Sequence, residues 1–195
     1  MIVRIPRTLS LLACSSFLSC VSLGAQTAPT ASPAGPTVSP GRLGFEVAAG
    51  PAFEVATAGE RASQRAVLAV PALTIRVFSW FDYAVEGHLS GHVTPVAGNV
   101  LGIVPIGFRV HTTGQTQVHL SAGAGIVWTD LAEVHGLDQR QNYITQVGVG
   151  VARVRPNGSG VSVEARFFHL SNLNGAPPNL GMEVFSVLVG YRLGR

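Results

Sequence analysis

From residue 43 onward, apolar residues occupy every second position in one segment after another. In residues 43–55, for example, Leu43, Phe45, Val47 and Phe53 alternate with small or charged residues. A period of two places such apolar side chains on one face of a β-strand. The same pattern predicts seven further strands, over residues 67–77, 83–93, 100–110, 118–128, 143–151, 161–167 and 185–193.

Composition indicates which face of these strands meets lipid. Apolar residues make up 47% of the chain and charged residues only 12%, yet past residue 25 no apolar run approaches the ~20 residues that a membrane-spanning helix needs. The second face of the strands is small and polar, which suits a narrow lumen better than the core of a soluble sandwich. We therefore expect an all-β fold, an eight-stranded antiparallel transmembrane β-barrel over residues 43–195. In the fourth strand, the expected lipid-facing residues are Val100, Val104, Ile106, Phe108 and Val110.

The first 42 residues are expected to lie outside the barrel. Residues 1–25 join a short basic start to an apolar run and predict a cleaved signal peptide, although "LLAC" (11–14) leaves a lipoprotein signal open as an alternative. Residues 26–42 are rich in Pro, Ala, Thr and Ser and predict a disordered or extended arm. Both cysteines, Cys14 and Cys20, lie in the leader, so the mature chain has neither a disulfide nor a cysteine nucleophile.

Connections between the predicted strands alternate in length. Short ones surround residues 79–82, 112–115 and 156–159, and longer ones cover 130–142 and 172–182. Outer-membrane barrels have short periplasmic turns and longer external loops. With the arm in the periplasm, the last long connection lies at the external end.

Three polar residues flank that last connection in "FFHLSNLNGAPPNLGMEVF" (167–185). The alternation of the flanking strands places His169, Ser171 and Glu183 on the lipid-facing side. Since the two strands are antiparallel neighbours, we expect these side chains to converge on the outer wall at the external end. A serine becomes nucleophilic when a neighbouring base takes its proton and an acid orients that base. Asn172 and Gly181 lie beside them and are candidates for supporting the loop or an oxyanion.

The motif "HLSN" (169–172), followed by "PNLGME" (178–183) and "VGYRL" (189–193), resembles the outer-membrane lipid A 3-O-deacylase (PagL-type) family. The resemblance implies an eight-stranded barrel in which His169 is the general base, Ser171 the nucleophile and Glu183 the orienting acid. It also implies loop or oxyanion support from Asn172, Asn179 and Gly181. The chain departs from the family pattern at Leu173 and Asn174, where small residues are usual.

These features predict an outer-membrane serine esterase that hydrolyses an ester-linked acyl chain of lipid A. A non-catalytic structural or adhesion barrel is the alternative, and a soluble ligand-carrying barrel ranks last. The expected partners are lipid A or lipopolysaccharide in the outer leaflet and the outer membrane itself; a homodimer is left open, and no nucleic acid, cofactor or metal is expected. His88 and His92 are four residues apart on one strand, ~13 Å, which favours a hydrogen-bonded lumen network over one shared ion. Asp130, Glu133 and Asp138 are expected to be solvated, with calcium binding as the alternative.

Overall fold

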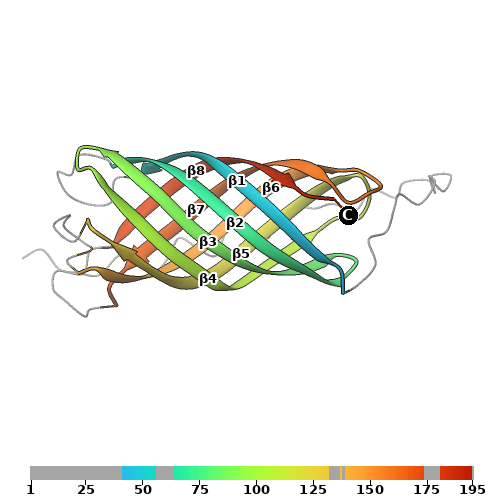
Figure 1. Ribbon diagram of the computed structural model, residues 1–195, viewed down its shortest axis with the longest axis horizontal. Coiled ribbons are helices and arrows are strands. Elements are labelled where there is room, and N and C mark those ends of the chain that lie inside the picture. The colour runs from blue at the N-terminus through green and yellow to red at the C-terminus, as the bar shows by residue number, and fades with distance from the viewer. Residues whose placement is uncertain (1–40, 56–63, 132–136, 138, 174–180, 195) are drawn as a thin grey trace, which may run out of the picture. The chain divides into compact units, whose positions relative to one another are not determined.

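The computed structural model describes residues 41–55, 64–131, 137, 139–173 and 181–194. Every strand pairs antiparallel with its sequence neighbours, and β1 pairs with β8 to close the barrel (Figure 1). The predicted eight-stranded antiparallel barrel is therefore confirmed, whereas the predicted signal peptide and nearly all of the arm lie outside the described residues. The strands are β1 (Leu43–Glu54), β2 (Arg65–Phe78), β3 (Phe81–Thr94), β4 (Gly98–His111), β5 (Thr116–Thr129), β6 (Gln141–Val154), β7 (Gly160–Ser171) and β8 (Met182–Arg192).

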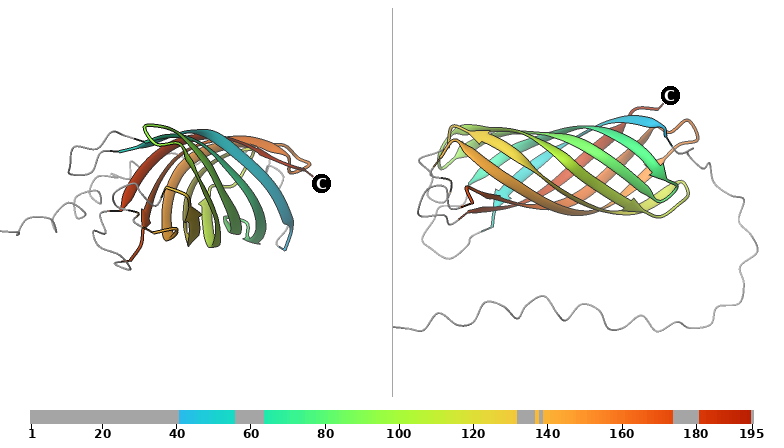
Figure 2. Two further views of the ribbon diagram at one scale, coloured as in Figure 1. Left: turned by 60° about the vertical axis from the view of Figure 1, so that its left-hand side comes forward. Right: turned by 90° about the horizontal axis from the view of Figure 1, so that it is seen from below.

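The two ends of the barrel differ in their connections. The C-terminus and the short connections after β2, β4 and β6 lie at one end of the barrel, and the last residues of β1, β3, β5 and β7 lie at the other (Figures 1 and 2). We call these the periplasmic and the external end, following the orientation expected from the sequence. Among the described residues, no helix is long and apolar enough to cross a membrane.

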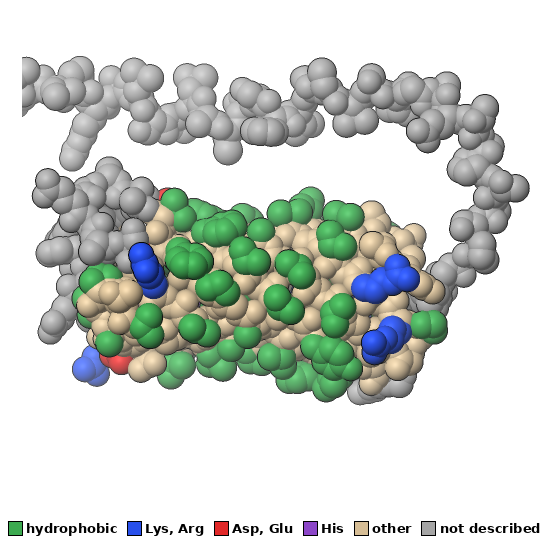
Figure 3. Space-filling view, turned by 90° about the horizontal axis from the view of Figure 1, so that it is seen from above, with side chains coloured by type: hydrophobic (Ala, Val, Ile, Leu, Met, Phe, Trp, Pro, Cys, Tyr) green, Lys and Arg blue, Asp and Glu red, His purple; other side chains and the backbone are tan. Residues whose placement is uncertain are grey.

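The outer wall is covered by apolar side chains. Figure 3 shows them over the middle of one face, with arginine side chains only toward the two ends. Such a band suits contact with acyl chains, because charged groups on a lipid face are tolerated only near the interfaces. Exposed aromatic rings gather toward the periplasmic end, where Phe78 stacks on Trp80 at 5.5 Å between ring centroids, and Trp128 and Tyr143 are exposed at the external end. These are the positions of an aromatic girdle.

A β-bulge in β4 places two residues on the lumen side that the sequence predicted on the lipid side. The pairing of β4 with β3 and with β5 shifts around Pro105, which has no ladder partner on either side. Proline cannot donate to a ladder and is tolerated at such a bulge. The extra residue changes which positions face outward, so Val100 and Val104 are buried in the lumen, at 0% and 1% exposed. The prediction that they face lipid was wrong, whereas Ile106, Phe108 and Val110 beyond the bulge are exposed as expected.

The external half of the lumen is apolar, which also differs from the small, polar interior expected. Leu68, Ile144, Phe168, Leu170 and Met182 are all buried and belong to one hydrophobic cluster. They come from the external ends of β2, β6, β7 and β8. The barrel therefore has a packed plug of side chains behind the outer-wall residues of β7 and β8.

The middle of the lumen is held by ion pairs. Arg166 Nη1 donates to Glu86 Oε2 at 2.6 Å, and its Nε donates to Glu164 Oε1 at 2.8 Å. Glu164 also contacts the imidazole of His119 at 3.0 Å, and Gln146 donates to Glu86 at 2.6 Å. Since every charge here has an opposite partner, the cost of burying each of them is offset.

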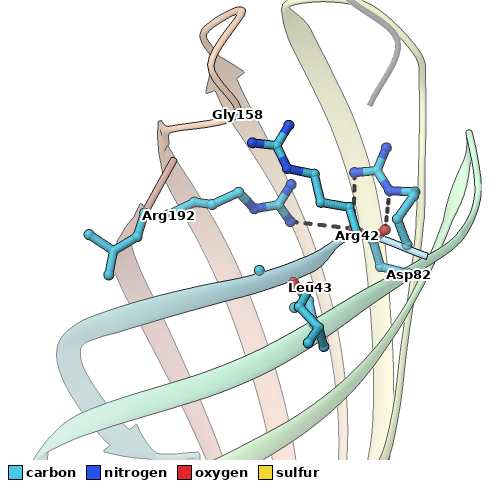
Figure 4. A pocket seen from close by; sticks show the side chains of 9 residues that line it. Arg42, Leu43, Asp82, Gly158 and Arg192 are labelled. Carbon is cyan, nitrogen blue, oxygen red and sulfur yellow. Dashed lines mark hydrogen bonds and ion pairs between the residues drawn. The ribbon is translucent and has the colours of Figure 1, made fainter. Parts of the chain in front are cut away.

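A second cluster of ion pairs lines the periplasmic mouth of the lumen. Arg109 donates to Glu46 at 2.8 Å, and Arg192 reaches both Glu46 and Asp82. Figure 4 shows the guanidinium of Arg192 directed at the Asp82 carboxylate, which also pairs with Arg76. Because the apolar plug fills the external end of the lumen, a lipid of the outer leaflet would meet the wall of the barrel and not its interior.

Candidate active site

His169 and Glu183 are directly opposite each other on β7 and β8. The register pairs His169 with Glu183, and on the other side it pairs His169 with Thr145 of β6. Both His169 and Glu183 are half-buried, and their neighbours Phe168, Leu170, Met182 and Val184 are buried in the lumen. Strand alternation then directs the imidazole and the carboxylate to the outer wall. Cross-strand partners have Cα atoms about 4.5–5.5 Å apart, which is within reach of a side-chain contact. In the described part of the chain, no hydrogen bond or ion pair joins the imidazole of His169 to the carboxylate of Glu183, so the register brings the two residues together without a direct bond between them.

Ser171 ends β7 on the same face, one step nearer the external rim. It is 8% exposed and pairs with Tyr143 of β6. The backbone N–H of Leu173 donates to its Oγ at 3.2 Å, which uses one acceptor position of the hydroxyl and keeps its hydrogen for donation elsewhere. Leu173 itself has a φ of 51°, a left-handed conformation that is unusual for a residue with a branched side chain. A strained residue held directly beside a polar cluster is typical of functional sites.

Gly181 fixes where the imidazole of His169 lies. Its φ is +68°, and a Cβ at this position would lie 2.5 Å from His169 Cε1 and 3.2 Å from Nε2. The ladder ends with Leu170 opposite Met182, so Gly181, the residue just before β8, is one position nearer the rim, on the side of Ser171. The ring of His169 is therefore tilted toward the external rim, in the direction of Ser171. The absence of a side chain at residue 181 is what makes room for it.

Asn172 points away from the outer wall and holds a loop. It is 2% exposed, and its Nδ2 donates to the carbonyl of Leu137 at 3.2 Å. Its own carbonyl accepts from Gln139 Nε2 at 3.5 Å. These contacts join the end of β7 to the segment that precedes β6. Asn179, the other predicted support residue, lies outside the described residues.

An apolar row lies next to the three polar residues, one step toward the middle of the barrel. Val147, Phe167, Phe185 and Phe53 are consecutive partners across β6, β7, β8 and β1. Phe185 and Phe53 are 39% and 45% exposed. A molecule at the site would therefore touch polar groups at the rim and aromatic rings immediately below, which is the polarity of a lipid at its headgroup boundary.

The other polar clusters raised by the sequence have local partners. His92 Nε2 contacts Ser90 Oγ at 3.3 Å, and His88 packs its ring against Phe168. The carboxylate of Asp130 accepts from the backbone N–H and the side-chain amide of Asn99, and the first of these bonds lowers the pKa of Asp130. Glu133 and Asp138 lie outside the described residues. Within the described part of the chain, no cluster of His, Cys, Asp or Glu has the arrangement of a metal site.

Thr145 and Tyr143, the β6 partners of His169 and Ser171, were not singled out as site residues by sequence reasoning. The turn at residues 155–159 could have identified them, because β6 and β7 form a hairpin whose pairs extend without a shift from Val154 and Gly160. Counting outward from that turn places Thr145 beside His169.

Comparisons with known proteins agree with the barrel fold. One family model, described as lipid A 3-O-deacylase (PagL), matches residues 72–192. The barrel resembles the crystal structure of the outer membrane enzyme PagL, with a TM-score of 0.55, 16% identity and coverage of 79% of this chain and 100% of that one. It also resembles Neisserial surface protein A (NspA), with a TM-score of 0.56, 14% identity and coverage of 78% and 97%. A comparison with curated proteins finds no similar sequence.

Proposed function

Because this chain belongs to the lipid A 3-O-deacylase (PagL) family, we propose that it hydrolyses the ester that links the 3-O acyl chain to the sugar of lipid A. The chain is an outer-membrane β-barrel, and lipid A in the outer leaflet is the substrate that its external rim would meet. The observation that carries the proposal is the register of His169 opposite Glu183 on the outer wall, with Ser171 on the same face at the rim.

In the proposed reaction, His169 takes the proton of the Ser171 hydroxyl as Oγ attacks the ester carbonyl. The tetrahedral intermediate collapses, the C–O bond to the sugar breaks, and His169 returns the proton to the leaving sugar hydroxyl. Water then attacks the acyl-serine with His169 again as base, which releases the fatty acid and restores Ser171. Glu183 orients the imidazole and stabilises its positive charge.

The supporting residues have separate proposed roles. Gly181 leaves the space into which the His169 ring leans. Asn172 supports the site through its bond to Leu137, and together with Asn179 it is a candidate for stabilising the oxyanion. The aromatic rings of Phe167 and Phe185 would contact the acyl chains of the bound lipid.

Ser171→Ala tests the proposal, with Ser162→Ala as the matched control. Ser162 lies on the same strand, but on the lumen side and near the periplasmic end. We expect purified Ser171→Ala barrel to release no 3-hydroxy fatty acid from lipopolysaccharide, while Ser162→Ala retains the wild-type rate and both variants assemble normally. An unchanged lipid A mass profile for Ser171→Ala would leave the alternative, a non-catalytic barrel that shares the fold with Neisserial surface protein A.

A further inference from the structure

Arg65 differs from the other described arginines of the strands in having no protein partner. Arg76, Arg109, Arg166 and Arg192 point into the lumen and pair with carboxylates. Arg153, at the periplasmic end, donates to Thr116 and Gln115. Among the described residues, the guanidinium of Arg65 has no hydrogen bond or ion pair, and its side chain is exposed.

Arg65 stands on the outer wall at the external end. It is the first residue of β2, and its strand neighbours Ala66 and Leu68 are buried in the lumen while Val67 is exposed. The pairing with β3 shifts between Arg65 and Ala66, but the extra residue, Val93, belongs to β3, and the ladder with β1 is regular here. Alternation along β2 therefore directs Arg65 outward. A basic side chain is poorly tolerated at the middle of a lipid face, but near the interface this cost falls close to zero, so the position suits an anionic group at the headgroup level.

The register connects Arg65 to the proposed active site. Arg65 pairs with Phe53, Phe53 with Phe185, and Phe185 with Phe167. Arg65 therefore continues the row formed by the rings of Phe53, Phe185 and Phe167. On β7 and β8, this row lies two residues from His169 and Glu183, toward the middle of the barrel. With strands ~4.8 Å apart and ~3.3 Å per residue, the Cα of Arg65 is about 12 Å from that of Glu183 and about 19 Å from that of Ser171.

We propose that Arg65 binds a phosphate of the substrate headgroup while the ester lies at Ser171. This inference rests on the proposed function, because it assigns a recognition contact to the same substrate. Lipid A is a disaccharide that carries phosphates and acyl chains, and only the phosphates are strongly anionic at neutral pH. A guanidinium matches phosphate geometry with two parallel N–H donors. The long side chain of Arg65 can bring its guanidinium closer to Ser171 than the two Cα atoms are. The remaining distance is comparable with the distance from a phosphate to an ester across the disaccharide.

Such a contact would make Arg65 a specificity residue that touches the substrate without touching the reacting bond. It would place the sugar across the rings of Phe53 and Phe185, and it would select lipids by their phosphate as well as by their ester. Arg140 is exposed in the segment before β6. It lies beyond the β-ladder, so the strand register does not determine whether its side chain faces the outer wall.

Binding in the Ser171→Ala background tests the inference without turnover. The probes are bisphosphorylated lipid A and the same lipid after chemical dephosphorylation, each titrated in neutral detergent micelles. We expect Arg65→Gln to weaken binding of the phosphorylated lipid about fivefold to tenfold and to leave the dephosphorylated lipid unchanged. Arg65→Lys should recover part of the loss, because it keeps the charge but not the paired donors.

Arg155→Gln is the matched control, since Arg155 is an exposed arginine at the periplasmic end and should bind both lipids as the parent does. Equal weakening of both lipids by Arg65→Gln, or no weakening of either, would overturn the inference. Displacement of lipid A by an equal charge of phosphatidylglycerol would overturn it too, since any lipid phosphate would then serve. The proposed function fails on a different result, the absence of acyl release by protein that retains Ser171.

Discussion

Replacing Gly181 by alanine should displace the ring of His169 and lower activity by more than the accompanying loss of barrel stability can explain. An alanine Cβ would lie 2.5 Å from His169 Cε1 and 3.1 Å from the carbonyl oxygen of Leu170. Carbon atoms in contact are normally 3.5–4.0 Å apart, so the imidazole must move by about 1 Å. A displacement of that size costs about 100-fold in rate, or ~2.7 kcal/mol of transition-state stabilisation.

Backbone strain is a separate effect of the same substitution. An alanine held at a φ of +68° costs roughly 1–2 kcal/mol relative to glycine, and this loss alone would not affect catalysis. Gly114 supplies the control, because its φ is +107° and nothing lies within 4 Å of the Cβ position. Gly114→Ala should therefore destabilise the barrel by a similar amount and leave acyl release at the wild-type rate.

The assay measures kcat/KM for fatty-acid release from lipid A in detergent, beside urea unfolding of the refolded barrel. We expect both variants to lose comparable stability, and only Gly181→Ala to lose activity. Activity within twofold of wild type in a folded Gly181→Ala barrel would refute the reasoning, because the ring would then not need the space above Gly181.

Three further substitutions test other parts of the structure. Glu183→Gln should lower kcat about 100-fold or more with little change in unfolding, since it keeps the shape but not the charge that stabilises the imidazolium; a wild-type kcat would remove Glu183 from the site. Arg166→Met should destabilise the barrel by about 3–5 kcal/mol in urea unfolding, because it leaves Glu86 without its ion pair in the lumen; unchanged unfolding would show that the pair contributes little. Asn172→Ala removes the bond to Leu137 and should cost about 1 kcal/mol and speed limited proteolysis between β5 and β6, and equal cleavage rates would argue against loop support.

The sequence predicted the fold and the face of the site for the same physical reason. Lipid and lumen impose opposite polarities on alternate residues, so in β7 and β8 the parity of Val161, Val163, Phe185 and Val187 extends without interruption to the rim. No bulge separates these residues from His169 in the observed register. Face assignment by alternation is reliable wherever the ladder is regular.

Alternation failed where the ladder is irregular or where size matters more than polarity. At Pro105 one extra residue changed the faces of β4, and the sequence shows the proline but not whether its neighbours shift. The sequence did not predict the apolar plug, because Leu68 and Phe168 alternate with the lipid-facing residues and interrupt a face that is otherwise polar. In the closed barrel they belong to the same hydrophobic cluster inside the lumen. The left-handed conformation of Leu173 has no sequence signal, since it depends on contacts formed after the chain folds.

The outward placement of His169 and Glu183 means that lipid supplies half of their surroundings. In an enzyme with a closed cleft, the protein's own side chains surround the reacting groups. Here the acyl chains that lie against Phe167 and Phe185 would also determine the dielectric and the packing around His169 and Glu183. A membrane of different lipid composition would therefore change the surroundings of these two groups without any change in the protein.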